Sequence, residues 1–186
     1  MANLNLENLT LKTAPKVSKE ILEKSQNTLG FIPNMYAKMA HNPSLLESYT
    51  NSYNSFRNNS GFTPIEQEVV FLSVAYENNC KYCMAAHSFI ADEMSKVPIE
   101  ITDAIREGKR ISNPKLAALS KLTRSITVHR GIISQNELAN FLKAGYNETH
   151  VLGIITGVAV KTLSNYSNHV THPEVDTPFT SRDWNK

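Results

Sequence analysis

The sequence predicts an all-α fold in a single domain of about eight helices. Helix-starting signals recur along the chain, and apolar residues follow them at helical spacing. No segment combines the strict alternation and the turn dipeptides of a β-hairpin. At 186 residues the chain is long enough for one well-buried core, and it contains no linker-like stretch. We therefore expect one domain, residues 1–186, with short turns between its helices.

The first part of the chain is expected to form an extended lead-in and then three helices. The signals are the Ser18 cap, the Gly30 stop, the segment Met35–Ala40, Pro43 in a first turn, and the Asn58–Gly61 breaker. We interpret residues 1–60 as an N-terminal helical extension that packs on a core formed by residues 61–170.

The core is expected to begin with a capping box, in which Thr63 is the N-cap, Pro64 the first helical residue and Glu66 the reciprocal partner. The run Val69–Leu72 would suit a strand by propensity, but the cap favours a helix. Further helices are expected from Pro98 to near Gly108, from Pro114 toward Arg130, from the Ser134–Glu137 capping box to Gly145, and from the Asn147 cap through Leu163. The tail from His172 is expected to pack as coil or to fray.

Charge and hydropathy argue against two classes of partner. The 19 basic and 17 acidic residues give a net charge of +2 and are mixed along the sequence, which does not indicate nucleic-acid binding. The longest apolar run, Val151–Val160, is too short to span a bilayer, which takes about 20 residues. The N-terminus lacks the order of a secretory signal, so we expect a cytoplasmic protein. In that compartment two cysteines indicate redox chemistry or metal binding rather than a structural disulfide.

Both cysteines of the chain, Cys80 and Cys83, stand in a Cys-x-x-Cys spacing, and His87 follows one helical turn later. If Asn79 is the N-cap, the helix opens at Cys80 and its dipole favours a thiolate over a thiol. Residues three and four apart share a helix face, so the two sulfurs can meet and the imidazole can reach Cys83. A hairpin of two helices would bring Glu68 over the cysteines.

These residues have the spacing Glu-x11-Cys-x2-Cys-x3-His, which resembles the alkylhydroperoxidase D family within the carboxymuconolactone decarboxylase-like superfamily. The segment Cys-Lys-Tyr-Cys-Met-Ala-Ala-His-Ser is most similar to the corresponding sequence in the peroxidase-related branch of that family. The segments Gly30–Asn34 and Asn165–His169 agree with that branch, so the resemblance spans most of the chain. It implies an alkylhydroperoxidase D-like helical domain and a homo-oligomer, either a trimer or a hexamer.

The resemblance further implies an antioxidant enzyme, a thiol-dependent peroxidase that reduces organic hydroperoxides without haem, flavin or metal. It assigns the sulfenic acid to Cys83, with Cys80 as the resolving cysteine. An external thiol or dithiol donor would reduce the redox-active disulfide. His87 would hold or accept the Cys83 proton, and Glu68 would act as a general base through water or through His87. We expect Cys80 to be the more accessible sulfur, and an otherwise apolar pocket that suits an organic hydroperoxide.

Other interpretations of the cysteine pair remain open. A redox-sensing or disulfide-exchange protein would use the same disulfide without turnover. A lactone decarboxylase-type enzyme is suggested only by the superfamily name, and those members lack this pair. The four residues could also hold zinc, although the chain has no second cysteine pair. Two inert buried cysteines are a further alternative, and a thioredoxin-like motif would need a strand before its helix.

Two more residues are candidates for secondary roles in the site. Tyr82 stands between the cysteines, where the best-studied branch of the family carries a histidine. One member of the family's proton relay is therefore missing, and the phenol can act only as a hydrogen-bond partner at neutral pH. His169 matches the C-terminal pattern of the branch and would line the pocket or a subunit contact. Packing or capping is the alternative role for both residues.

The remaining histidines and two glycines are expected to be structural. No partner is evident in the sequence for His41, His129, His150 or His172. Gly153 and Gly157, four residues apart on the last long helix, are expected to allow close helix packing within or between subunits.

Overall fold

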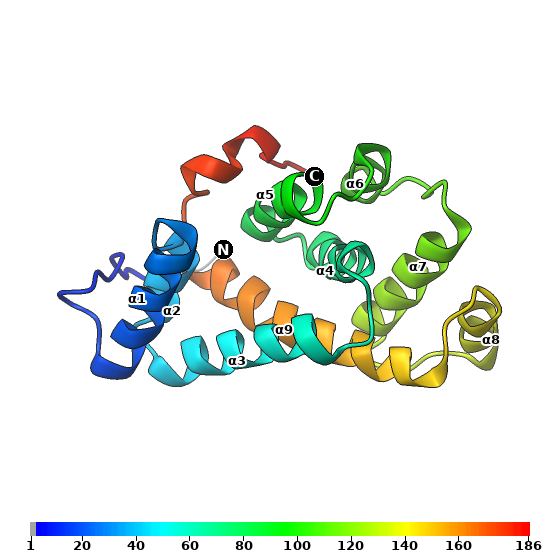
Figure 1. Cartoon of the computed structure of the whole chain (residues 1–186), viewed down its shortest axis with the longest axis horizontal. Coiled ribbons are helices and arrows are strands. Elements are labelled where there is room, and N and C mark those ends of the chain that lie inside the picture. Colours follow the sequence, from blue (N-terminus) through cyan, green and yellow to red (C-terminus); the bar gives the residue numbers. More distant parts are fainter. Residues whose placement is uncertain (1–2) are drawn as a thin grey trace.

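The computed structural model describes residues 3–186, which form nine α-helices, one π-helical turn and one 3₁₀ helix, with no strand (Figure 1). In chain order these are α1 (Lys16–Leu29), α2 (Asn34–Met39), α3 (Pro43–Asn59), α4 (Pro64–Glu77), α5 (Lys81–Phe89), the π-helical turn (Ile90–Met94), α6 (Ile99–Arg106), α7 (Pro114–Val128), α8 (Gln135–Lys143), α9 (Glu148–Thr171) and the 3₁₀ helix (Thr177–Arg182). The all-α prediction is confirmed, with one α-helix more than the expected eight.

Helix α4 is the centre of the core. Every residue from 66 to 75 is buried, and the helix packs against α5, α7 and α9 (Figure 1). A helix that is apolar on all sides is stable only when it is surrounded in this way. The predicted capping box is present: the Thr63 hydroxyl accepts from the Glu66 backbone, and the Glu66 carboxylate accepts from the Thr63 backbone at 2.9 Å. This cap explains why the strand-like run Val69–Leu72 is helical.

The other predicted starts of helices are mostly confirmed, with two corrections. The Ser134–Glu137 box and the Asn147 cap form as expected. Helix α1, however, begins at Lys16 directly after Pro15, and Ser18 lies inside it. The buried Ser18 hydroxyl donates to the Ala40 carbonyl at 2.9 Å, so it joins α1 to the end of α2 instead of capping a helix.

The second correction concerns the turn before the cysteines. Asn79 is not an N-cap but adopts the left-handed conformation, with φ of 53°, which asparagine tolerates better than most residues. Cys80 is the N-cap, in extended conformation, and α5 begins at Lys81. Cys80 is therefore the last residue before the helix, and Cys83 lies in its first turn.

The two glycines of α9 allow close packing within the chain. A Cβ atom at Gly153 would lie 2.8 Å from the Ser60 carbonyl oxygen, and one at Gly157 would lie 2.6 Å from Val70 Cγ1. Larger residues would separate α9 from α3 and α4, so these positions serve the packing of the monomer.

Both ends of the chain pack on the helical core. The Leu4 backbone donates to the Val170 carbonyl at 2.7 Å, which joins the lead-in to the end of α9. The tail contains the 3₁₀ helix, which packs on α5 (Figure 1), where the sequence predicted coil. The Trp184 indole is buried and donates to the Arg106 carbonyl at 2.9 Å. The tail therefore covers the helix that follows the cysteines.

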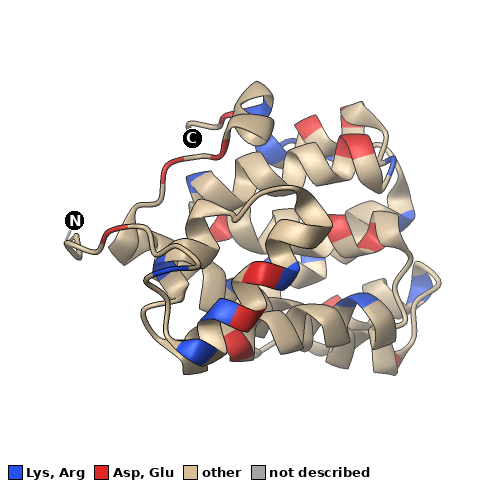
Figure 2. Cartoon of the chain, turned by 60° about the vertical axis from the view of Figure 1, so that its left-hand side comes forward, with Lys and Arg blue, Asp and Glu red and all other residues tan. Residues whose placement is uncertain are grey.

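Charges are interspersed over the surface, as the sequence indicated (Figure 2). None of the helices in residues 3–186 has the length and hydrophobicity needed to cross a membrane. Three of the histidines for which the sequence showed no partner have one in the structure. His41 bonds the Glu7 carbonyl at 2.8 Å, His129 bonds the Ser125 hydroxyl at 3.1 Å, and His150 bonds the Asn147 cap at 2.7 Å.

Candidate active site

The site is built on α4 and α5, which the left-handed turn at Asn79 joins as a hairpin. Cys80 is the N-cap of α5 and Cys83 is its third helical residue. Side chains at these two positions face each other, as they do in a capping box. His87 follows Cys83 by one turn. All three residues are buried: the exposed fraction of the surface is 1% for Cys80, 2% for Cys83 and 4% for His87. The hairpin places Glu68 opposite His87, as the sequence predicted.

His87 and Glu68 form a buried pair in which His87 Nδ1 lies 2.9 Å from Glu68 Oε2. Since the carboxylate can only accept, Nδ1 carries the proton and Nε2 is left to take one up. Burial lowers the pKa of His87, and the positive charge of Lys161 lowers it further, against the opposing effect of Glu68. The imidazole is therefore neutral near pH 7 and can accept a proton.

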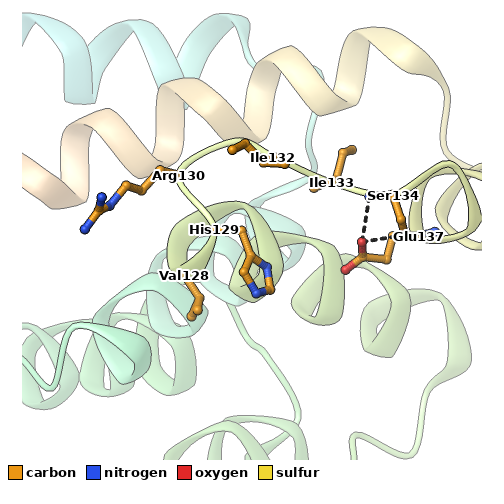
Figure 3. Close-up of a pocket in the computed structure, with 7 residues that line it drawn as sticks. All are labelled: Val128, His129, Arg130, Ile132, Ile133, Ser134 and Glu137. Atoms are coloured by element: carbon orange, nitrogen blue, oxygen red, sulfur yellow. Dashed lines mark hydrogen bonds between the residues drawn. The ribbon is translucent and has the colours of Figure 1, made fainter.

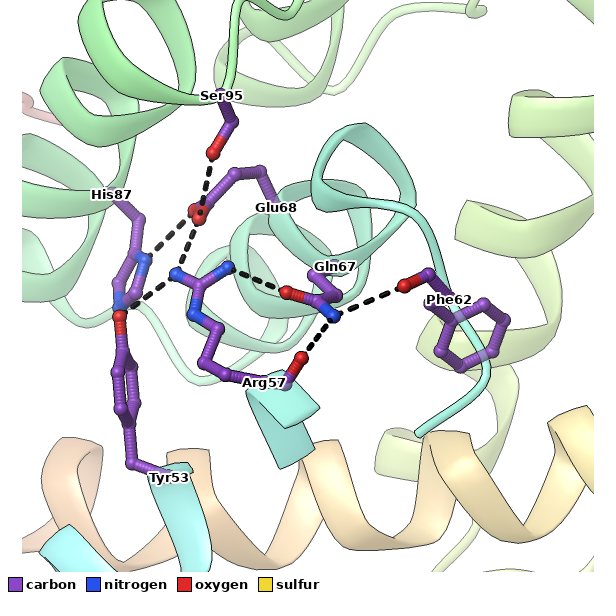
Figure 4. A network of polar contacts seen from close by, with 7 residues as sticks. All are labelled: Tyr53, Arg57, Phe62, Gln67, Glu68, His87 and Ser95. Carbon is purple, nitrogen blue, oxygen red and sulfur yellow. Dashed lines mark hydrogen bonds and ion pairs between the residues drawn. The ribbon is translucent and has the colours of Figure 1, made fainter. Parts of the chain in front are cut away.

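The other carboxylate oxygen of Glu68 bonds a residue of α3 that sequence reasoning missed (Figure 4). Arg57 Nη2 pairs with this oxygen and also donates to the Tyr53 hydroxyl at 2.8 Å, while Nη1 donates to Gln67 at 3.1 Å. Burial raises the pKa of Glu68, but His87 and Arg57 outweigh it, so the net shift is downward. A buried carboxylate stays ionised here because both of its oxygens are paired.

Helix α9 supplies the second group of residues that contact the sulfurs, and the sequence did not identify them. Asn168 Nδ2 donates to Cys83 Sγ at 3.3 Å and to Cys80 Sγ at 3.6 Å. Ser164 Oγ lies 3.7 Å from Cys83 Sγ. Lys161, Ser164 and Asn168 follow at helical spacing, so one face of α9 lies against the cysteine pair. A polar stripe in an otherwise apolar helix is the sequence signal that could have found them.

His169, which the sequence suggested would line the pocket or a subunit contact, has a ring contact away from the two sulfurs. It is half-buried and stacks on Tyr166, with ring centroids 6.4 Å apart. Tyr166 is exposed. The adjacent Asn168, one residue earlier, contacts the sulfurs instead.

Tyr82 bonds the C-terminal tail. Its hydroxyl donates to Asp176 Oδ2, and Asp176 Oδ1 accepts from the Asn34 backbone at 3.0 Å. Burial and the Asp176 charge raise the pKa of Tyr82 well above its usual value, so the phenol stays a neutral donor. Tyr82 thus holds the tail and the start of α2 beside the cysteine helix.

The environment divides the two thiols electrostatically. Hydrogen bonding to Cys83, together with burial, raises the pKa of Cys80 well above its usual value. Burial also raises the pKa of Cys83, but the hydrogen bond from Cys80 and the positive charge of Lys161 outweigh it. The pKa of Cys83 is therefore well below its usual value. The surroundings therefore favour ionisation of Cys83 before that of Cys80.

The two sulfurs are less accessible than the sequence indicated. Cys80 was expected to be the more accessible sulfur, but both cysteines are buried, because the tail and α9 pack on α5.

A surface pocket of about 580 Å³ lies where α7 turns into α8 (Figure 3) and includes none of the four predicted site residues. Within residues 3–186, no group of three or more His, Cys, Asp or Glu side chains is arranged to hold a metal ion.

The buried pair makes folding sensitive to acid. The pKa values of His87 and Glu68 lie below their usual 6.5 and 4.5, so the unfolded chain takes up protons first. Their stabilising contribution is present above those unfolded values and is lost as pH falls through the folded ones. We expect the free energy of unfolding to decrease below pH 6.5 and again below pH 4.5, measured by denaturant titration. His87→Gln should remove the first decrease; an unchanged profile in that variant would contradict this assignment.

Comparisons with known proteins show the class of fold. No protein-family model and no curated protein matches the sequence. Among solved structures, an uncharacterized peroxidase-related protein from Ralstonia eutropha JMP134, described as an alkylhydroperoxidase AhpD core, superimposes with a TM-score of 0.82 at 19% identity, over 94% of this chain and 93% of that one. A peroxidase-related protein from Silicibacter sp. TM1040 gives 0.80 at 18% identity, over 97% and 95%.

A third solved structure is a cysteine-to-alanine variant of the debrominase Bmp8 in complex with 2,3,4-tribromopyrrole, with a TM-score of 0.78 at 15% identity over 97% of this chain and 96% of that one. The chain is therefore a helical protein with the fold of the alkylhydroperoxidase D core and of peroxidase-related proteins, as the motif suggested. Identities of 15–19% define the fold and leave the activity to be argued from the site.

Proposed function

We propose that this protein is a thiol-dependent peroxidase that reduces organic hydroperoxides. The observation that carries the proposal is the uneven environment of the cysteine pair, in which Asn168 and Ser164 contact Cys83 and the surroundings lower the pKa of Cys83 while they raise that of Cys80. A thiolate is the nucleophile that attacks a peroxide, and a neighbouring thiol is what resolves the product. The fold shared with peroxidase-related proteins supports the same reaction class.

The reaction would proceed in three balanced steps. The Cys83 thiolate attacks one peroxide oxygen; the O–O bond breaks, the alkoxide takes a proton and leaves as alcohol, and Cys83 becomes a sulfenic acid. The Cys80 sulfur then attacks the sulfenic sulfur, and water leaves as the disulfide forms. Two thiol groups of an external donor finally reduce this disulfide and become a disulfide themselves. Apolar side chains around the site, with Phe71 against His87 and Met35 against Asn168, favour an organic peroxide over a strongly hydrated one.

His87 and Glu68 would move the proton. Neutral His87 takes the proton released when the thiols ionise, and Glu68 orients the ring and stabilises its charged form. We expect His87→Ala and Glu68→Gln each to slow disulfide formation by about 10²–10⁴-fold without preventing it. Stopped-flow measurement of the oxidation rate checks this. Wild-type rates in both variants would remove the pair from the mechanism.

A redox-sensing or disulfide-exchange protein is the second candidate, and the burial of both sulfurs favours it, since a buried pair exchanges slowly with donors. Steady-state consumption of cumene hydroperoxide with excess dithiothreitol separates the two. An enzyme consumes many equivalents per chain, whereas a sensor consumes one and stops. Because one neighbour is a debrominase, 2,3,4-tribromopyrrole serves as a second substrate, with bromide release as its readout.

We expect the protein to assemble as a homo-oligomer, a trimer or a hexamer. Large apolar side chains are exposed on α9, at Leu152 and Ile155, and after α7, at Ile132, which is 80% exposed. Leu152 and Ile155 lie three residues apart on one face of α9, and a contiguous exposed apolar patch is typical of an interaction surface. Light scattering at micromolar concentration measures the mass, and a monomer would refute the expectation. Ile132→Lys should lower the mass if this residue lies in the interface.

A further inference from the structure

Helix α9 carries a lysine in the core that the proposed reaction does not use. Lys161 is fully buried, and its Nζ has no hydrogen-bond partner among residues 3–186. The nearest ring is Phe71, whose centroid lies 5.4 Å from Nζ. An ammonium group in such a place is costly unless an opposite charge lies nearby. The structure must therefore contain a compensating anion within reach.

Two observations place Lys161 near the reactive sulfur. Lys161 shares a face of α9 with Ser164 and Asn168, which both contact Cys83 Sγ, at 3.7 Å and 3.3 Å. The Phe71 ring under Nζ also packs against the His87 imidazole, with centroids 4.9 Å apart. Lys161 thus lies on the face of α9 that meets Cys83, and it shares the Phe71 ring with His87.

The charges around it leave one candidate anion. The Glu68 carboxylate is already paired with Arg57 and His87. The Asp176 carboxylate accepts from Tyr82 and from the Asn34 backbone. The other side chains that act on Cys83 are thiols, hydroxyls, phenols or bases. We propose that Lys161 is the counter-ion of the Cys83 thiolate, and that it makes the Cys80–Cys83 disulfide a stronger oxidant. Lys161 is then a positioning residue, since it acts through Cys83.

The second half of the proposal follows from charge balance. Reduction by a dithiol converts the disulfide into one thiol on Cys80 and one thiolate on Cys83, with release of one proton and formation of the donor's disulfide. Lys161 has an anionic partner only in this reduced state. Stabilising the reduced state makes a disulfide more oxidising. The Lys161 charge also lowers the pKa of Cys83, after the larger effects of burial, which raises it, and of the Cys80 hydrogen bond, which lowers it.

The first test titrates the reduced protein and follows thiolate absorbance in the ultraviolet, which requires no reagent to reach the buried sulfur. In Lys161→Met the ratio of thiolate to thiol at a given pH should fall about tenfold or more. Lys161→Arg, which keeps the charge, should titrate close to wild type. Lys81→Met is the matched control, because Lys81 adjoins Cys80 in sequence but is exposed. A wild-type titration in Lys161→Met would overturn the proposal.

The other charged and titratable groups around Cys83 stay constant in the comparison. They are Tyr49 and Arg57 on α3, Glu68 on α4, Cys80 at the N-cap of α5, Tyr82 and His87 on α5, and Asp176 in the tail, which bonds Tyr82. If Lys161→Met does not fold, Lys161→Gln gives the same test, because it also removes the charge.

The second test equilibrates each protein with mixtures of reduced and oxidised dithiothreitol. Lys161→Met should favour the disulfide about tenfold more than wild type, which is ~30 mV for a two-electron couple. The difference should shrink at a pH low enough to protonate Cys83, which a purely structural role would not produce. An equal or weaker disulfide in the variant would overturn the redox half. The redox part of this proposal rests on the proposed function, because it needs the Cys80–Cys83 disulfide. If the wild-type protein forms no disulfide, the proposed function fails, while the titration still tests whether Lys161 is the counter-ion of Cys83.

Discussion

Replacing Cys83 by serine is expected to abolish reaction with peroxide, because a serine hydroxyl is essentially never ionised at neutral pH. The structure concentrates its thiolate-stabilising contacts on this sulfur, including the Asn168 amide at 3.3 Å and the hydrogen bond from Cys80. Peroxide loss and mass spectrometry of the cysteine peptide after stoichiometric peroxide measure the effect. No oxygen addition and no disulfide should be found.

The matched variant is Cys80→Ser, which should still react once. Its Cys83 has no resolving partner, so oxidation should stop at sulfenic acid, trappable with dimedone, and proceed to sulfinic acid under excess oxidant. The opposite pattern, with Cys83→Ser reactive and sulfenic acid on Cys80, would exchange the two roles. Helix position would then outweigh the surrounding charges in activating the thiol, while the reaction class would survive.

Removing Arg57 is expected to give the largest loss of stability. Arg57→Met leaves the fully buried Glu68 carboxylate with only His87 as a strong partner, and breaking a buried ion pair costs about 3–5 kcal/mol. The pKa of Glu68 should rise, because Arg57 helps to hold it below its usual value. Urea denaturation at neutral pH measures the change in the free energy of unfolding.

A matched control for this prediction is Lys19→Met, which breaks an exposed pair with Glu23 and should cost less than about 1 kcal/mol. Arg57→Lys keeps the charge but loses the planar fork that reaches Tyr53, Gln67 and Glu68 together, so its stability should lie between those of Arg57→Met and wild type. Equal stability of Arg57→Met and Lys19→Met would show that the buried pair contributes little.

Local signals in the sequence predicted most of the fold. Thr63 with Glu66 and Ser134 with Glu137 form capping boxes because the partners lie three residues apart and need nothing else from the fold. The prediction that Asn79 is an N-cap was wrong, because the local sequence allows two conformations there: asparagine suits both an N-cap and the left-handed conformation. Packing of α4 against α5 decided between them, and made Cys80 the cap.

The site was predictable only as far as its residues lie on one local pattern. Cys80, Cys83 and His87 share one helix end, and a hairpin sufficed to add Glu68. Arg57 reaches the site from α3, and Lys161 and Asn168 reach it from α9, far along the chain. Their contacts depend on how helices cross, which single-sequence patterns do not encode. The burial of both sulfurs was likewise invisible, since it depends on the tail over α5.

The tail over α5 determines how hydroperoxides and dithiol donors reach the buried cysteine pair. The tail is held beside α5 through Asp176, which accepts from the Tyr82 hydroxyl and from the Asn34 backbone, and through Trp184, which donates to the Arg106 carbonyl. A hydroperoxide needs to bring only its terminal oxygen to one sulfur, whereas a dithiol donor must bring two sulfur atoms to the pair in succession. Reduction of the disulfide should therefore be slower than its formation.

The central claim is that Cys80 and Cys83 are a redox pair that peroxide oxidises to a disulfide. Thiol counting before and after one equivalent of cumene hydroperoxide, with peroxide loss followed in the same sample, tests it most directly. We expect two thiols per chain to disappear for each peroxide consumed. The peptide that contains both cysteines should lose the mass of two hydrogens. Two thiols remaining after the peroxide treatment, or zinc bound to them in stoichiometric amount, would contradict it.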